Sequence, residues 1–139
     1  MSIKILLIDD EPQLCETLKK GLEFTGGFEV IVALSGKDGI QKAKRLNPDV
    51  IVLDICMPGM DGLAVLRTLK SKYPMSAIPV IMLSSLVDES TKKECNYEYG
   101  EEYIEKPVDI LVLKSRIEAA LHRMGRLPGS GHATPPRAT

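Results

Sequence analysis

The sequence contains no tryptophan, and aromatic residues make up only 4% of its 139 residues. Cysteine is equally scarce. Because Cys15, Cys56 and Cys95 form neither an even set nor a CxxC pair, we interpret them as reduced, small hydrophobic residues. The two histidines, His122 and His132, are too few and come too late for a metal cage. A chain of this length buries roughly 65 to 70% of its unfolded surface, so it needs no disulfide or structural metal.

Charge of one sign and long hydrophobic runs are also missing. The 18 Lys and Arg residues nearly balance the 19 Asp and Glu residues, giving a net charge of −1. Proteins that coat nucleic acid or anionic membranes depend on an excess of basic residues, so we expect neither partner. No apolar run approaches the roughly 20 residues that span a bilayer, and the segment Met1 to Lys4 has no signal-peptide layout. We therefore expect a cytoplasmic protein.

Short apolar runs alternate with longer segments of helical spacing. This alternation predicts an α/β fold in which a doubly wound parallel sheet is covered by helices on both faces. The apolar runs that we interpret as strands are Ile3–Ile8, Phe28–Leu34, Val50–Leu53, Pro79–Leu83 and Glu102–Ile104.

The helices are predicted from caps, breakers and apolar residues repeated at steps of three or four. They are Pro12–Leu22 before the breaker Gly26-Gly27, Gly36–Leu46 after the cap Ser35, Gly62–Lys72 after the cap Asp61, and a last helix after the cap Asp109. Segment Asp88–Glu98 has few apolar residues, so we expect its helix to be short, mobile or partner-dependent.

Residues 1–124 form the predicted domain. Residues 125–139, rich in Gly and Pro, are predicted to be a disordered tail, a linker or a remnant of cloning.

Polar residues follow the predicted strands at the edge where such sheets bind ligands. A single polar residue at a strand end is often only a helix cap, but the whole set points to a site. Its members are Asp9, Asp10 and Glu11 after the first strand, Asp54 after the third, Ser84 and Ser85 after the fourth, and Lys106 after the fifth.

Clustered carboxylates repel one another unless a hard cation lies between them, and oxygen ligands favour Mg²⁺ over Zn²⁺. A lysine and a serine hydroxyl opposite the metal can neutralise the oxygens of a phosphoryl group. Asp54 is the best placed nucleophile, because it ends a buried central strand and faces the acidic pair. The residues therefore predict Mg²⁺-dependent phosphoryl chemistry that gives an aspartyl phosphate.

The pair Asp9-Asp10, the segment VLDICMPGMDG around Asp54, Ser84 and the segment YIEKP resemble a response-regulator receiver domain of bacterial two-component signalling, of the chemotaxis-regulator type. The resemblance runs from about Ile3 to Met124. It implies a flavodoxin-like fold of five βα units with strand order 2-1-3-4-5, and a cis peptide bond between Lys106 and Pro107.

The resemblance also implies a role for each site residue. Asp54 resembles the phosphoacceptor, Ser84 and Lys106 the groups that bind phosphoryl oxygens, and Ser84 with Tyr103 the switch pair. The ligands implied for Mg²⁺ are Asp9, Asp10, Asp54 and the backbone carbonyl of Cys56.

A receiver of this kind takes its phosphoryl group from a histidine kinase or a phosphotransfer protein in a phosphorelay. It is not an enzyme in the usual sense, since it catalyses only its own phosphoryl uptake and slow aspartyl-phosphate hydrolysis. The resemblance implies an altered surface over the fourth helix, fifth strand and fifth helix, which regulates a downstream protein or an output domain missing from this sequence. Homodimerisation through that face is suggested by Glu102, Arg116 and Arg123, whose alternative role is a solvated charged face.

Three other functions stay open at this point. The chain could be a receiver-like docking module that works without phosphorylation, although the acidic pair, Asp54 and Lys106 are all present. A phosphohydrolase of the haloacid-dehalogenase type carries DxD after its first strand, where this sequence has DDE. A nucleotide-binding or flavin-binding module wraps phosphates with a glycine-rich loop, whereas the loop here reads DDEPQ and would repel them.

Overall fold

The structure is a computed structural model that describes residues 2–55, 57, 62–84 and 102–125. Five parallel strands form one sheet in the order β2-β1-β3-β4-β5. This confirms the doubly wound, flavodoxin-like fold. The strands are β1 (Ile3–Ile8), β2 (Phe28–Ala33), β3 (Val50–Asp54), β4 (Val80–Ser84) and β5 (Glu102–Glu105).

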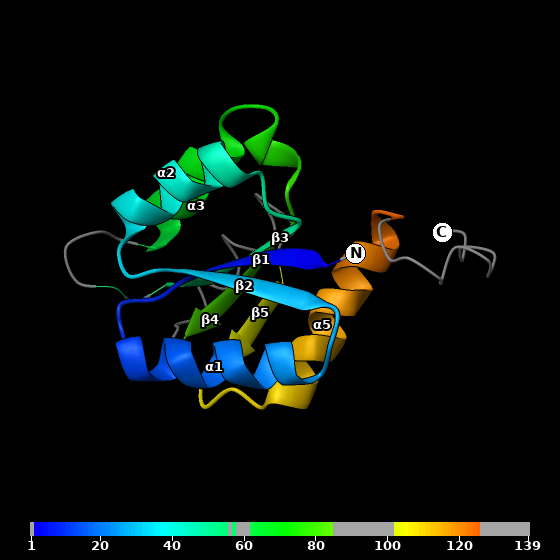
Figure 1. Cartoon of the computed structure of the whole chain (residues 1–139). Coiled ribbons are helices and arrows are strands. Elements are labelled where there is room, and N and C mark those ends of the chain that lie inside the picture. Colours follow the sequence, from blue (N-terminus) through cyan, green and yellow to red (C-terminus); the bar gives the residue numbers. More distant parts are fainter. Residues whose placement is uncertain (1, 56, 58–61, 85–101, 126–139) are drawn as a thin grey trace.

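Helices cover both faces of the sheet. In Figure 1, α2 and α3 lie on one face, and α1 and α5 lie on the other. The α-helices described are α1 (Pro12–Phe24), α2 (Gly36–Leu46), α3 (Gly62–Lys70) and α5 (Ile110–Arg123), and a 3-10 turn, η1 (Met75–Ala77), precedes β4. Among the described residues, no helix combines the length and the apolar character needed to cross a membrane.

The core consists of two apolar clusters, one on each face, because successive strand residues point to opposite sides. On β3, Ile51 and Leu53 pack into the cluster beneath α2 and α3, whereas Val50 and Val52 pack into the cluster beneath α1 and α5. All residues of β3 and β4 are buried. The central strands are therefore fixed on both faces, and their carboxyl ends make a rigid support for a site.

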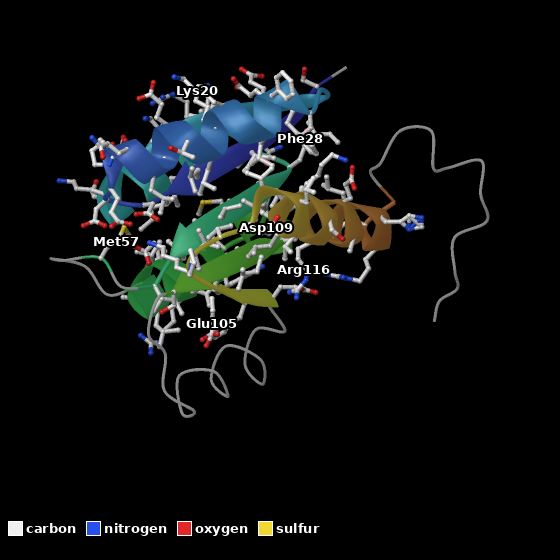
Figure 2. The ribbon with its side chains drawn as sticks, turned by 90° about the horizontal axis from the view of Figure 1, so that it is seen from below. Lys20, Phe28, Met57, Glu105, Asp109 and Arg116 are labelled. Atoms are coloured by element: carbon white, nitrogen blue, oxygen red, sulfur yellow. The ribbon has the colours of Figure 1, made fainter. Side chains whose placement is uncertain are left out.

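Two of the predicted caps are confirmed by hydrogen bonds. The Ser35 hydroxyl oxygen accepts from the Asp38 N–H at 3.1 Å. One carboxylate oxygen of Asp109 accepts from the N–H groups of Leu111 at 2.8 Å and Val112 at 3.3 Å, and Figure 2 shows Asp109 at the beginning of α5. The peptide bond between Lys106 and Pro107 is cis, as the resemblance implies.

Some predicted boundaries are wrong by one or two residues. Helix α3 ends at Lys70 rather than Lys72, because the Ser71 N–H and hydroxyl both donate to the Thr68 carbonyl and close the last turn. Strand β2 ends at Ala33, one residue earlier than predicted, and α1 continues to Phe24, two residues further. The turn η1 was not predicted.

Several predictions fall outside the described residues: the cap Asp61, the carbonyl of Cys56, Ser85, the helix in Asp88–Glu98 and the tail beyond Gly125. They stay predictions.

Candidate functional site

Three charged side chains meet at the carboxyl edge of the sheet because they continue the alternation of their strands. Asp9 follows β1, Asp54 ends β3, and Lys106 follows β5. Each comes two residues after a strand residue of the cluster beneath α1 and α5; those strand residues are Leu7, Val52 and Ile104. Because side chains two residues apart on a strand point the same way, all three charged side chains point to the face of the sheet that α1 and α5 cover.

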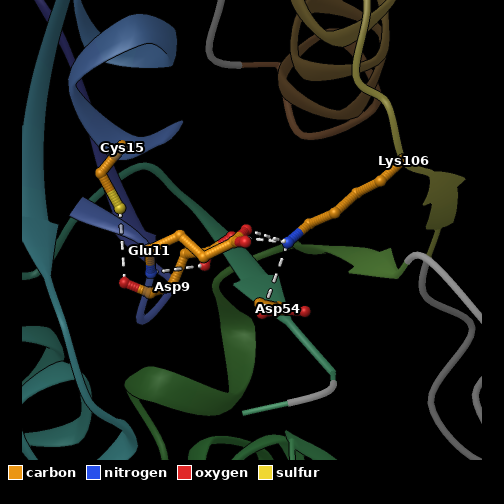
Figure 3. Close-up of polar contacts among 5 residues, drawn as sticks. All are labelled: Asp9, Glu11, Cys15, Asp54 and Lys106. Atoms are coloured by element: carbon orange, nitrogen blue, oxygen red, sulfur yellow. Dashed lines mark hydrogen bonds and ion pairs between the residues drawn. The ribbon is translucent and has the colours of Figure 1, made fainter. Parts of the chain in front are cut away.

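The ammonium group of Lys106 lies among three carboxylates (Figure 3). Its Nζ is 3.0 Å from Glu11 Oε1, 3.1 Å from Asp9 Oδ2 and 3.5 Å from Asp54 Oδ2. Burial works to lower the pKa of Lys106, but the carboxylates of Glu11 and Asp9 outweigh it and raise that pKa above its ordinary value. The side chain therefore stays charged at neutral pH.

Asp9, Asp10 and Asp54 form an acidic cluster in which one oxygen of each lies within 4.8 Å of the others. Asp9 is 0% exposed and Asp54 is 3% exposed. Burial, followed by the nearby charge of Asp54, raises the pKa of Asp9. Two buried carboxylates at this distance favour a cation between them. The structure thus brings together the three side chains that the sequence analysis assigned to a metal.

One buried oxygen of this cluster supports that assignment. Among the described residues, Asp9 Oδ2 accepts no hydrogen bond, although the ammonium of Lys106 is near it. The Lys106 ammonium compensates this oxygen in part through the 3.1 Å ion pair, and the oxygen keeps lone pairs that a further cation can use. The donor set consists of carboxylate oxygens, which suit a hard divalent cation. The residues present therefore fit the metal that the resemblance implies.

The backbone around Asp9 is held by several hydrogen bonds. Asp9 N–H donates to the Ala33 carbonyl at 3.0 Å, and Asp9 Oδ1 accepts from the Glu11 N–H at 3.1 Å. The Cys15 thiol donates to the Asp9 carbonyl at 3.3 Å. Burial, and then the charge of Asp9, raises the pKa of Cys15 to about 12, so the thiol stays protonated. Cys15 is a free, buried cysteine, as predicted from the absence of an even cysteine set or a CxxC pair.

Ser84 and Tyr103 come from the neighbouring strands β4 and β5, at alternate positions that face the helices α2 and α3. Ser84 is fully buried at the end of β4, and its carbonyl accepts from the Lys106 N–H at 2.8 Å. Tyr103 on β5 pairs with Met82, two residues before Ser84, and its half-buried side chain packs against the cluster beneath α2 and α3. Ser84 therefore lies at the carboxyl edge of the sheet near Asp54, whereas Tyr103 lies one level lower, in register with Met82 and Leu53.

The sequence analysis missed the pairing of Glu11 with Lys106. Glu11 was counted among the polar residues after the first strand, but no local signal places its carboxylate on a lysine 95 positions away. The charged residues considered for a homodimer pair within the chain: Glu102 contacts Arg116 at 2.9 Å and Arg123 at 3.7 Å. A homodimer stays a prediction.

Comparisons with known proteins give a consistent answer. The family model for the response regulator receiver domain matches residues 5–118. The chain is 34% identical over 125 residues to the DNA-binding dual master transcriptional regulator RpaA of Synechocystis, covering 90% of this chain and 52% of that protein. It is 36% identical over 124 residues to the alkaline phosphatase synthesis transcriptional regulatory protein PhoP of Bacillus subtilis, covering 88% and 50%. The chain thus spans about half the length of these curated relatives.

Solved structures agree with this result. The receiver domain of the Francisella response regulator 1452 matches with a TM-score of 0.79 and 31% identity, over 88% of this chain and 99% of that one. A CheY-like response regulator receiver domain protein from Methanospirillum hungatei matches with a TM-score of 0.83 and 25% identity, over 91% and 98%. This chain therefore belongs to the family of response regulator receiver domains of two-component signalling systems.

Proposed function

We propose that Asp54 is the phosphoacceptor of this receiver domain and takes a phosphoryl group from a histidine kinase or a phosphotransfer protein. One observation carries the proposal: the nearly buried Asp54 carboxylate lies within 4.8 Å of Asp9 and Asp10 and 3.5 Å from the Lys106 ammonium. A nucleophile beside both an acidic cation site and a fixed positive charge suits phosphoryl transfer.

In the proposed step, a carboxylate oxygen of Asp54 attacks the phosphorus of a phosphohistidine. A new O–P bond forms while the P–N bond breaks, and the imidazole leaves with the electron pair of that bond. Lys106 neutralises charge on an equatorial phosphoryl oxygen, and the Ser84 hydroxyl donates to another. The rigid ends of β3, β4 and β5 hold these groups in place, which lowers the entropic part of the barrier.

We assign the metal site to Mg²⁺, which Asp9, Asp10 and Asp54 would hold. The family resemblance adds the backbone carbonyl of Cys56, outside the described residues, as a further proposed ligand. When bound by these carboxylates, Mg²⁺ would supply positive charge that offsets their mutual repulsion and the negative charge of an incoming phosphoryl group.

The proposed output is a change of surface. Phosphorylation shifts the populations of two conformers in which Ser84 and Tyr103 differ, and this alters the face that contains β5 and α5. The only chemistry of this domain is its own phosphoryl uptake and the slow hydrolysis of its aspartyl phosphate. The relatives of which this chain spans about half the length are named as transcriptional regulators. We therefore propose that the signal passes, in the cytoplasm, to an output domain or a downstream protein, and that the receiver itself contacts neither nucleic acid nor a membrane.

Intact-mass spectrometry after incubation with acetyl phosphate tests this function. The wild type should gain one labile phosphoryl adduct in the presence of Mg²⁺ and almost none with EDTA. Asp54→Asn should gain none. Asp38→Asn is the matched control, since it makes the same chemical change at a surface residue whose carboxylate pairs with Lys42, and it should label like the wild type. An adduct on Asp54→Asn would refute the assignment, and no adduct on any variant would favour a docking module that works without phosphorylation.

A further inference from the structure

The Lys106 ammonium makes its shortest carboxylate contact with Glu11, a residue outside the proposed metal site. The distance is 3.0 Å, close to the 3.1 Å to Asp9 and shorter than the 3.5 Å to Asp54. The Glu11 side chain is 59% exposed, whereas Asp54 is nearly buried. Figure 3 shows the Glu11 carboxylate beside the ammonium, with Asp54 on a different side of it.

The local structure of Glu11 leaves its side chain available for this contact. Glu11 is the N-cap residue of α1, yet its side chain makes no capping hydrogen bond. Its main chain is fixed instead, because its N–H donates to Asp9 Oδ1 and its carbonyl accepts from the Cys15 N–H. A fixed backbone with a carboxylate turned to Lys106 makes a contact that can break without disturbing the helix.

A lysine ammonium has three N–H donors, and here three carboxylates surround it. A phosphoryl group on Asp54 would bring new anionic oxygens that need one of those donors. The buried oxygens of Asp9 and Asp54 belong to the acidic cluster that a cation would neutralise. Glu11 would then be the carboxylate that still competes with the phosphoryl group for Lys106.

We infer that Glu11 is a positioning residue that holds the Lys106 ammonium toward α1 in the unphosphorylated domain and thereby slows phosphoryl uptake at Asp54. The inference rests on the proposed function. In the unphosphorylated state, the ion pair between Glu11 and Lys106 must open before Lys106 can bind the oxygens of the incoming phosphoryl group.

The first measurement is the initial rate of labelling by acetyl phosphate at saturating Mg²⁺. Glu11→Gln should label about two- to fivefold faster than the wild type, which is the range expected when a partly exposed ion pair is removed. Glu16→Gln is the matched control, because it removes the same charge from α1 at a residue that pairs with Lys20. The control should label at the wild-type rate. An unchanged or lower rate for Glu11→Gln would overturn the inference.

A second comparison separates competition for Lys106 from general repulsion of the anionic donor. In a Lys106→Ala background, which labels more slowly, Glu11→Gln should bring no further acceleration because the competing contact no longer exists. The same acceleration in both backgrounds would overturn the inference and point to general electrostatics. Melting temperatures of all variants verify that each is folded.

Failure of this inference and failure of the proposed function give different results. If the wild type labels at Asp54 while Glu11→Gln matches it, the inference fails and the function stands. If the wild type does not label, the proposed function fails and this inference fails with it.

Discussion

At the scale of single residues, Lys106 connects β5 to the carboxylates that follow β1 and end β3. Its ammonium reaches Asp9, Glu11 and Asp54 from the end of β5. We expect Lys106→Ala to retain some Mg²⁺-dependent labelling, because the proposed nucleophile and metal ligands remain, but to lose the conformational response. Comparing the NMR spectra of the labelled and unlabelled variant checks this. Shifts at β5 and α5 as large as those of the wild type would show that Lys106 does not couple the site to that surface.

Gly62 is a second residue on which the site depends. A Cβ atom at Gly62 would lie 2.4 Å from Ile55 Cα and 2.5 Å from the Ile55 carbonyl oxygen, and this backbone directly follows Asp54. We expect Gly62→Ala to lower the free energy of unfolding by about 1 to 3 kcal/mol, as overpacking does. At Gly21 the nearest atom is the flexible end of Ile110, at 2.7 Å, so Gly21→Ala should cost clearly less. Urea unfolding of both variants measures the difference, and equal losses would contradict the argument.

At the scale of elements, side chains from α1 and α2 satisfy the outer edge of β2. Glu23 accepts from the Val30 N–H at 2.9 Å, and Lys19 donates to the Val30 carbonyl at 2.7 Å. Lys42 donates to the Val32 carbonyl, also at 2.7 Å. Unpaired strand edges invite pairing with other chains, and these contacts occupy groups that such pairing needs.

The same edge gives a pH-dependent prediction. The hydrogen bond from the Val30 N–H, with the contact to Lys19, lowers the pKa of Glu23 below its ordinary value of 4.5. A lowered pKa stabilises the folded state above pH 4.5, and this contribution is lost as the pH falls through the folded-state pKa. Glu23→Gln should therefore lower the melting temperature at pH 7, and the difference should shrink below about pH 4. Glu16→Gln should show little change at either pH. A difference for Glu23→Gln that does not depend on pH would contradict the prediction.

At the scale of the whole molecule, the proposed metal site would couple metal binding to folding. An ion that binds only the folded protein stabilises the folded state, by about 1.4 kcal/mol when the ion concentration is ten times the Kd. We expect millimolar Mg²⁺ to raise the melting temperature by a few degrees, and Asp10→Asn to weaken that rise because one of the three clustered carboxylates is lost. Sodium chloride of equal ionic strength is the control. A melting temperature that does not respond to Mg²⁺ would count against the metal site.

Much of the fold and site could be predicted from the sequence, because the relevant signals are local. Apolar runs alternating with capped helices indicate a parallel sheet, and polar residues such as Asp9, Asp54 and Lys106 mark the strand ends that such a sheet brings to one edge. The ends of helices were harder to predict. Helix α3 ends where Ser71 closes a turn on the Thr68 carbonyl, and this turn differs little in energy from one more helical residue.

The sequence by itself determined the order of elements, the acidic cluster and the lysine opposite it, since strand parity and strand ends follow from residue spacing. Only the tertiary structure decided which carboxylate the lysine contacts most closely and how the edge of β2 is satisfied. Glu11 and Lys106 are 95 positions apart, and Lys19 and Val30 are 11 apart on different elements. Contacts of this kind depend on how elements pack and on which rotamers long side chains adopt, and neither is written in a local pattern of residues.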